Sequence, residues 1–143
     1  MKTITTEIVI NANKDIVWKI LTDFNSYPDW NPFITQIQGE LKTGSRFNVT
    51  MNIEGRKPTS FQPDIISMTP GEKFCWKGKL FIKGLFDGTH YFILEEMEEE
   101  KTRLSHGENF TGLLTGPVLR KIGGVTREAF ERMNLALKER AEK

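Results

Sequence analysis

The chain has 143 residues, of which 38% are hydrophobic and 27% are charged, and this length and balance are typical of one compact domain. Twenty lysines and arginines against nineteen aspartates and glutamates leave a formal net charge of +1, so the chain lacks the strong positive field of a nucleic-acid-binding protein. The single cysteine, Cys75, has no intramolecular partner, which excludes a disulfide framework and a zinc site built from several cysteines.

The first residues, 1–7, contain no secretory apolar segment, and no apolar run approaches the ~18 residues that a membrane-spanning helix needs. Together with the lone cysteine, this predicts a soluble, cytoplasmic protein without a membrane span. No linker, low-complexity tract or internal repeat divides the sequence. We therefore expect a single domain over residues 1–143, present as a monomer or a weak homodimer.

A strand and a helix are predicted at the start of the chain. Apolar and polar residues alternate over residues 4–10, which is the period of a strand buried on one face. Asn13 is a suitable N-cap, and the apolar residues that follow it predict a helix over 14–24, since they recur at Val17, Ile20, Leu21 and Phe24. The segment 26–32, with prolines at 28 and 32, fits a single helical turn.

The remainder of the chain changes to the two-residue period of strands and ends in a helix. Residues 46–54 form the clearest strand, and turn-forming pairs separate further strands at about 33–40, 60–69, 72–79, 87–97 and 101–111. Apolar spacings of three and four predict a long amphipathic helix over about 117–141, interrupted by glycines 123 and 124. This order predicts an α+β fold in which the terminal helix covers the apolar face of an antiparallel meander.

The only two histidines lie in the two strands on either side of an acidic hairpin tip at 98–100. A three-residue tip would place Met97 opposite Lys101 and therefore His90 opposite Glu108, whereas a two-residue tip would break this facing. Directly opposed side chains have Cβ atoms only ~4.5–5.5 Å apart, so the two side chains would be close enough for a hydrogen bond. The sequence thus predicts an imidazole–carboxylate pair inside a mostly apolar cavity.

Such a pair has several possible uses. A carboxylate beside an imidazole favours the protonated ring, and the pair could orient the polar end of a ligand or act as general acid and base, with His90 and Glu108 as the catalytic candidates. A purely structural hydrogen bond is an equally good interpretation. His106, alone among apolar neighbours, is more typical of a core residue, and no ligand-spacing motif supports a metal site built from His90, His106 and Glu108. No motif in the sequence indicates a cofactor.

Large apolar side chains are the other candidates for binding. Taken singly, each is more typical of a plain core, but ten phenylalanines and five methionines offer much adaptable apolar surface. The segment 80–88 is either a mobile flap over a cavity mouth or a continued strand with a tight turn. The candidate ligand-binding residues are Trp30, Phe33, Phe47, Met51, Trp76, Phe92, His106, Phe110, Phe130 and Met133.

Three short motifs near the N-terminus resemble the START-like, or SRPBCC, superfamily, and its polyketide cyclase/dehydrase-like group is the most similar. They are Ile10-x-Ala12, Val17-Trp18-x-x-Leu21-Thr22-Asp23-Phe24 and Tyr27-Pro28-x-Trp30-Asn31-Pro32, and the glycine-rich start of the last helix supports the same resemblance. The resemblance spans essentially the whole chain and is most specific over residues 10–33. It implies a helix-grip fold, in which a seven-stranded antiparallel sheet curls around the long C-terminal helix, with two short helices between strands 1 and 2 and a hydrophobic cavity under the helix.

Three functions follow from this resemblance and from the residues. The first is binding of a small hydrophobic or aromatic molecule, lipids included, in the cavity. The second is a cyclase or dehydratase reaction that uses His90 and Glu108, and the third is a protein-interaction module similar to chaperone activators, using the segment 80–88 and the exposed face of the terminal helix. A cavity of ~300 Å³ or more that reaches His90 would support the first two. Whether the chain is an enzyme stays open at this point, and fold alone selects no activity.

Overall fold

Eight strands and a long C-terminal helix account for most of the chain described by the computed structural model, which covers residues 2–79 and 86–143. The expected α+β class, with two short α-helices between the first two strands, is confirmed. The part of the proposed flap at 80–85 lies outside the described residues. In chain order the elements are β1 (Lys2–Ile10), α1 (Lys14–Thr22), η1 (Phe24–Ser26), α2 (Tyr27–Trp30), β2 (Ile34–Gln38), β3 (Asn48–Met51), β4 (Thr59–Phe61), β5 (Asp64–Thr69), β6 (Lys73–Lys79), β7 (Asp87–Glu98), β8 (Lys101–Thr111) and α3 (Thr115–Ala141).

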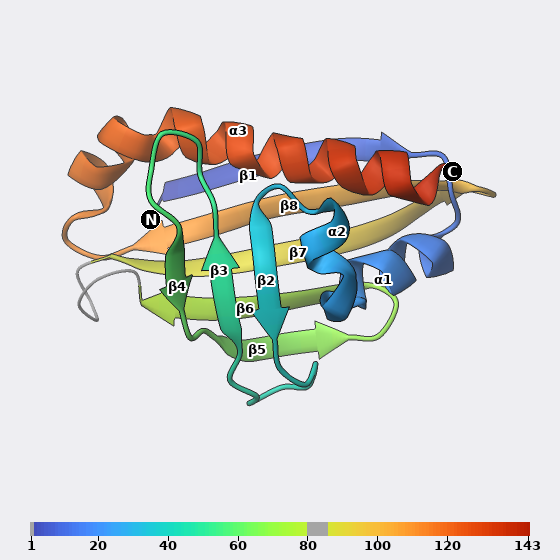
Figure 1. The fold of residues 1–143 in the computed structure, drawn as a ribbon, viewed down its shortest axis with the longest axis horizontal. Helices are drawn as coiled ribbons and strands as arrows, with labels where there is room; N and C mark the ends of the chain where they lie inside the picture. Colours follow the sequence, from blue (N-terminus) through green and yellow to red (C-terminus); the bar gives the residue numbers. More distant parts are fainter. Residues whose placement is uncertain (1, 80–85) are drawn as a thin grey trace.

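The strands form two antiparallel sheets rather than the single seven-stranded sheet that was expected. One sheet has the order β1-β8-β7-β6-β5, and the other has the order β2-β3-β4 (Figure 1). The predicted strand at 60–69 is in fact two strands, one in each sheet, with Pro63 between them. Because proline has no N–H to donate to a strand ladder, the chain leaves one sheet there and enters the other. Main-chain hydrogen bonds from Phe47 to Pro63 (2.9 Å) and from Ile65 to Ser45 (2.8 Å) keep the two sheets adjacent.

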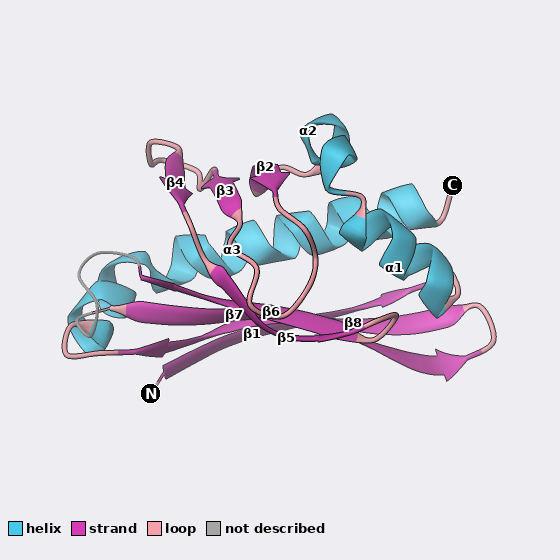
Figure 2. Cartoon of the chain, turned by 90° about the horizontal axis from the view of Figure 1, so that it is seen from below, coloured by secondary structure: helices cyan, strands magenta, loops and turns pink. Residues whose placement is uncertain are grey.

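The helices and the small sheet all lie on one side of the large sheet. Figure 2 shows β1 and β5–β8 as one layer, with α3 lying along it and β2–β4 standing beside the helix. The apolar face of α3 packs on β1 and β8, which is the covering role predicted for the terminal helix. Its buried residues include Ala129, Phe130, Met133 and Leu137, which recur at helical spacing.

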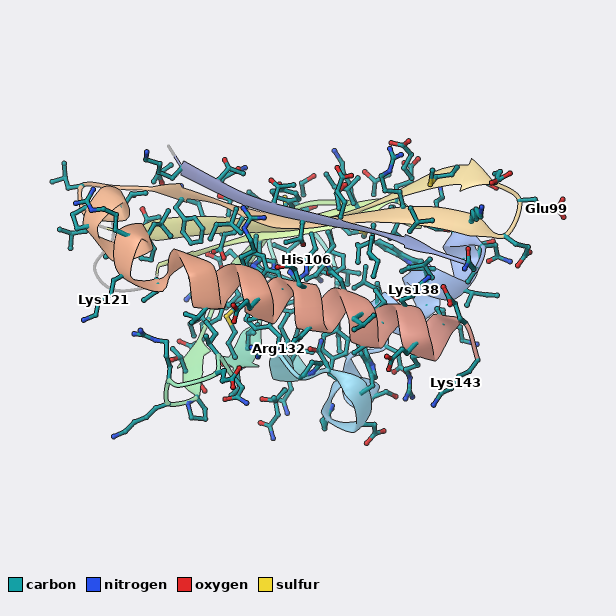
Figure 3. The ribbon with its side chains drawn as sticks, turned by 90° about the horizontal axis from the view of Figure 1, so that it is seen from above. Glu99, His106, Lys121, Arg132, Lys138 and Lys143 are labelled. Atoms are coloured by element: carbon teal, nitrogen blue, oxygen red, sulfur yellow. The ribbon has the colours of Figure 1, made fainter. Side chains whose placement is uncertain are left out.

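Helix α3 differs from its prediction in two ways. It begins at Thr115, two residues earlier than expected, and it continues through Gly123 and Gly124 without the predicted interruption. Glycine lowers helix propensity, but it keeps its N–H, so the hydrogen-bond ladder can pass through it. In Figure 3 the first turns of α3, near Lys121, lie at an angle to the rest of the helix. None of the described helices combines the length and the apolar character needed to cross a bilayer.

Candidate functional site

The β7–β8 hairpin brings the predicted pair together. Its register places Phe92 opposite His106 and His90 opposite Glu108, as the alternating pattern predicted. The tip, however, is a two-residue turn at 99–100, and Met97 forms a bulge in β7. The expectation that a two-residue tip would break the facing is therefore wrong, because the extra residue in the bulge restores the register that the shorter turn would have shifted.

A continuous chain of buried hydrogen bonds runs inward from this pair. Glu108 Oε1 lies 3.2 Å from His90 Nδ1, and His90 Nε2 lies 2.7 Å from His106 Nε2. His106 Nδ1 is 2.8 Å from the side-chain oxygen of Asn134 on α3, and the Asn134 amide nitrogen donates to the Thr6 hydroxyl on β1 at 2.7 Å. Thr6 in turn donates to the main-chain oxygen of His106 at 2.7 Å. We call these five side chains the polar chain; it joins β1, β7, β8 and α3.

Aromatic rings enclose the two imidazoles. Trp76 stacks on His90 with ring centroids 5.1 Å apart, and Phe130 stacks on His106 at 4.5 Å. Phe92 lies 4.4 Å from His106, and both imidazoles have no exposed surface. Figure 3 shows His106 near the middle of the molecule, between α3 and the sheet. The chain's two histidines are thus held in an apolar shell that excludes water.

This shell decides the charge state of the pair. Burial lowers the pKa of His90 to about 3 and raises the pKa of Glu108 to about 8, because each loses the hydration of its charged form. The pKa of His106 is also lowered, first by burial and then by the neighbouring His90. At neutral pH the pair is therefore a carboxylic acid beside a neutral imidazole. Desolvation thus opposes the protonated ring that a neighbouring carboxylate would favour.

A pocket of about 150 Å³ opens at the Glu108 end of the polar chain. It is half the size that was expected to support ligand binding, and His90 is not among its lining residues, although Phe33 and Phe130 both line it and pack on His90. The walls come from β8, α3, the segment before β7 and the small sheet with its β3–β4 loop. The lining residues are Phe33, Met51, Ile53, Arg56, Lys57, Thr59, Phe61, Phe86, Glu108, Phe110, Ile122, Thr126 and Phe130.

Two buried polar groups belong to this mostly apolar pocket. The hydrogen bond of Glu108 to the described residues uses Oε1 alone, and Oε2, which lies against Gly88, has no hydrogen-bond partner among them. Thr126 is 6% exposed, and its hydroxyl has no hydrogen-bond partner among the described residues. Convergent polar groups in an apolar hollow are typical of ligand sites. Arg56 and Lys57 are exposed at the rim.

The structure divides the predicted ligand-binding residues into two groups. Phe33, Met51, Phe110 and Phe130 line the pocket with Glu108. The others do not line it: some are packed around the imidazoles or in the core, and Trp30 is half-buried against Tyr27, 5.2 Å away. This second group comprises Trp30, Phe47, Trp76, Phe92, His106 and Met133.

Sequence reasoning did not identify Thr6, Asn134, Gly88 or Thr126. Thr6 carried a usable signal, because it occupies the buried face of a strand otherwise lined by isoleucines. Asn134 carried a similar one, as a buried amide on the face of α3 that holds Phe130 and Leu137. A polar residue on an apolar face needs a hydrogen-bond partner. Neither position indicates which partner it has.

The geometry does not favour a metal ion at the histidines. His90 and His106 direct their Nε2 atoms at each other across a hydrogen bond, rather than at a common point. Within residues 2–79 and 86–143, no group of three or more His, Cys, Asp or Glu side chains is arranged to hold a metal ion.

Comparison with known proteins gives a family-level match. The family model described as polyketide cyclase / dehydrase and lipid transport matches residues 1–142. No curated protein matches the chain.

Many solved structures share its fold. The Zhui aromatase/cyclase from Streptomyces sp. R1128 has a TM-score of 0.79 at 13% identity, covering 99% of this chain and 93% of its own. A START superfamily protein from Mycobacterium smegmatis has a TM-score of 0.73 at 19% identity, covering 98% and 97%. The major latex-like protein 151 from Panax ginseng has a TM-score of 0.78 at 13% identity, also covering 98% and 97%.

Proposed function

Because this chain belongs to the polyketide cyclase/dehydrase and lipid transport family, we propose that it binds a small hydrophobic or aromatic molecule in the pocket beside Glu108. The observation that carries this proposal is an apolar hollow with a buried carboxyl group in its wall. Apolar burial supplies the affinity at roughly 25 cal/mol per Å², and the carboxyl group orients the ligand's polar end.

The pocket volume limits what can enter. A cavity of about 150 Å³ lined by apolar side chains is large enough to accept a benzene-sized molecule. We therefore expect a single ring, or the end of a longer chain, to occupy the hollow. The rest of a larger ligand would extend past the β3–β4 loop into solvent.

A pocket-filling variant tests this proposal. Ile122→Trp places a large ring in the hollow from α3, whereas Leu135→Trp, at a position of the same helix that is 51% exposed, is the matched control. By titration calorimetry, p-xylene should bind the wild type and Leu135→Trp alike, and Ile122→Trp should bind at least about ten-fold more weakly. Native mass spectrometry of the purified protein should also show a bound small molecule. Equal binding by Ile122→Trp would contradict the proposal.

An enzymatic function is the second candidate, and one observation favours it. Burial raises the pKa of Glu108 to about 8, and this side chain lines the pocket with the His90 imidazole 3.2 Å away, which is an arrangement suited to general acid catalysis on a bound ligand. Glu108→Gln separates the two candidates, because glutamine preserves the hydrogen bond to His90 but has no acidic proton. A cyclase or dehydratase would lose turnover in this variant and keep binding. His90→Ala should likewise abolish turnover, whereas a carrier would keep much of its affinity.

The interaction-module hypothesis depends on the exposed face of α3 and on the segment 80–88, of which 80–85 lies outside the described residues. Phe86 is buried and stacks on Phe110, with ring centroids 5.3 Å apart, and Asp87 and Gly88 belong to β7. These three residues are therefore part of the fold rather than of a free surface. A cytoplasmic location and a monomeric or weakly dimeric state stay predictions.

A further inference from the structure

The direction of each hydrogen bond in the polar chain is determined at its inner end. A main-chain carbonyl oxygen can only accept, so the Thr6 hydroxyl must give its single hydrogen to His106 O. The Thr6 oxygen is then an acceptor for Asn134, which requires the amide nitrogen of Asn134 to face Thr6 and its oxygen to face His106. The contact between His106 Nδ1 and the Asn134 oxygen therefore requires a hydrogen on His106 Nδ1.

This direction propagates outward through the two imidazoles. A neutral imidazole has one N–H and one acceptor nitrogen, so His106 Nε2 must accept from His90 Nε2. His90 Nδ1 is then the acceptor nitrogen of its ring, and it faces Glu108 Oε1 at 3.2 Å. Burial favours the neutral ring over an imidazolium, and with His90 neutral the hydrogen between these two atoms comes from Glu108, which makes Oε1 the hydroxyl oxygen of a carboxylic acid.

The other oxygen of Glu108 is then a carbonyl oxygen. Oε2 has no hydrogen-bond partner among the described residues, and it belongs to a side chain in the pocket wall. As the carbonyl oxygen of an acid whose hydrogen is already used, it can only accept. A ligand that brings a hydrogen-bond donor satisfies it, and a ligand that brings only an acceptor places two acceptors against each other.

We propose that this pocket selects ligands whose inner end is a neutral hydrogen-bond donor, such as a phenol or alcohol hydroxyl, and rejects ligands whose inner polar atom only accepts, such as an ether or an aldehyde. This inference rests on the proposed binding function and names the ligand class for it. Thr6 and Asn134 are positioning residues, since they set the orientation of the Glu108 carboxyl without touching the ligand.

Reversing the selectivity would require the whole polar chain to change. To donate to a ligand, Glu108 would have to withdraw its hydrogen from His90, and both imidazoles would have to change tautomer. The Asn134 amide would then have to turn over and Thr6 would have to leave the His106 carbonyl, which would stay buried without its donor. Each of these steps breaks or rebuilds a buried polar contact. The hydrogen-bond directions along the polar chain therefore change together or not at all.

Thr126 provides the second contact to the ligand hydroxyl. Its own hydroxyl is buried without a partner, and a threonine in a helix occupies two χ1 rotamers, so this group can turn toward the pocket. A ligand hydroxyl can donate to Glu108 Oε2 and at the same time accept from Thr126. A hydroxyl satisfies both wall groups, whereas an ether oxygen can satisfy only Thr126.

The first experiment measures the tautomers without any ligand. In ¹⁵N NMR spectra at neutral pH, we expect His106 to carry its hydrogen on Nδ1 and His90 to carry its hydrogen on Nε2. A hydrogen on His90 Nδ1, in the neutral ring or in a doubly protonated one, would show that Glu108 is a carboxylate, which attracts cations as well as neutral donors, and would overturn the neutral-donor class. This measurement is independent of whether the pocket binds anything.

The second experiment uses four ring-sized probes that differ at one substituent: p-cresol, 4-methylanisole, 4-methylbenzaldehyde and p-xylene. In titration calorimetry, p-cresol should bind at least about ten-fold more tightly than the ether and the aldehyde, which leave Oε2 facing an acceptor. Glu108→Gln should keep this preference, because its amide donates to His90 and its carbonyl oxygen still faces the pocket.

Thr6→Val tests the positioning role. It removes the hydroxyl that anchors the polar chain. Thr3→Val makes the same substitution at an exposed position of β1, where the hydroxyl donates to Asn109. Thr6→Val should reduce the p-cresol preference to within about three-fold of the other probes and leave p-xylene binding unchanged, and Thr3→Val should change neither.

The outcomes separate the two proposals. If neither p-xylene nor p-cresol binds, the proposed binding function is wrong. The proposed ligand class is then wrong too, even if NMR finds the expected tautomers. If all four probes bind equally, the pocket is real and the donor selectivity is wrong. A preference for the ether or aldehyde would overturn the inference in the same way.

Discussion

At the scale of single residues, the Glu108 carboxyl group depends on a glycine across the strand pair. A Cβ atom built on Gly88 would collide with Glu108 Oε2, so the absence of a side chain there makes the space in which the acid lies. Sequence analysis places Gly88 both in the proposed flap at 80–88 and at the start of the strand predicted over 87–97, and the structure places it in β7. Gly88 is therefore as necessary to the site as the histidine two residues later.

We predict that Gly88→Ala weakens both stability and ligand binding. The added methyl group would displace the carboxyl group and break its 3.2 Å bond to His90, which leaves a buried imidazole nitrogen without a donor. An unsatisfied buried group costs about 1–3 kcal/mol, so urea unfolding should show a loss of that size, and the p-cresol preference should disappear. Unchanged stability and preference would mean that the carboxyl group is not held where the structure has it.

We also predict that stability is greatest near pH 6.5. The folded chain holds the Glu108 proton up to about pH 8, whereas an ordinary glutamate loses it near 4.5, so this stabilisation is complete below 4.5 and is lost as the pH rises to 8. The histidines act in the opposite sense, because their lowered pKa values remove stability as the pH falls below 6.5. Between pH 4.5 and 6.5, the two histidines raise the free energy of unfolding with pH more steeply than Glu108 lowers it.

Urea unfolding across pH 4 to 9 measures this curve. Above pH 6.5 the wild-type free energy of unfolding should decline by up to about 1.4 kcal/mol per pH unit, and Glu108→Gln should show no such decline because its amide does not titrate. A wild-type curve that rises from pH 6.5 to 8 would show that Glu108 is ionised in the folded chain.

At the scale of elements, local patterns predicted the hairpin well and the long-range contacts poorly. The facing of His90 and Glu108 follows from alternation along two adjacent strands, so the sequence contained it. The contacts of Thr6 and Asn134 join β1 to α3 across 128 positions of the chain, and no local period encodes such a pairing. The charge state of Glu108 could not be predicted from the sequence either, because it depends on an aromatic shell assembled from several elements.

The strand assignments show the same limit. The alternation at 60–69 looked continuous, and only Pro63 marked the point at which the chain changes sheets. A proline inside a strand pattern argues against a central strand, so the signal was present. Which sheet each half would join depended on Arg46, Phe47 and Ile65, whose contacts close the corner.

We predict that Gly124→Ala stabilises the protein. Nothing lies within 4 Å of the position that a Cβ atom would occupy, and the residue is exposed within α3. Alanine gains about 0.5–1 kcal/mol over glycine in a helix interior, and thermal unfolding should show a correspondingly higher Tm. The variant is also a control for Gly88→Ala, because the same substitution should act in the opposite direction. A lower Tm would show that the bend near this glycine is required.

At the scale of the whole molecule, the pocket exists because three separate parts meet. The large sheet supplies Glu108 and Phe110, α3 supplies Ile122, Thr126 and Phe130, and the small sheet closes the side. One exposed ion pair, Arg132 on α3 with Glu54 in the β3–β4 loop at 2.6 Å, joins the last of these parts to the helix. Figure 3 shows Arg132 on the side of α3 that faces the small sheet.

We predict that Arg132→Gln changes ligand exchange more than stability. An exposed ion pair contributes at most about 1 kcal/mol, so urea unfolding should be little affected. Freeing the β3–β4 loop from α3 should let p-cresol leave the pocket several-fold faster in NMR exchange measurements. Arg103→Gln, whose partner Glu95 lies on the distant part of the β7–β8 hairpin, is the matched control and should leave exchange unchanged. Equal exchange in both variants would show that the loop does not control entry.

The bulge at Met97 makes the hairpin tolerant of a change in length at one position and intolerant of it elsewhere. The pairs on either side of the bulge are Glu96 with Thr102 and Glu98 with Lys101, and without Met97 they would be consecutive pairs of the ladder. Deleting Met97 should therefore give a regular ladder and keep Glu108 opposite His90. Deleting Ile93 instead would shift the register of β7 by one residue, so that side chains on one side of the deletion would move to the opposite face of the sheet. Among relatives of this chain, one-residue gaps should therefore be found at the bulge and be absent from the strand on its N-terminal side.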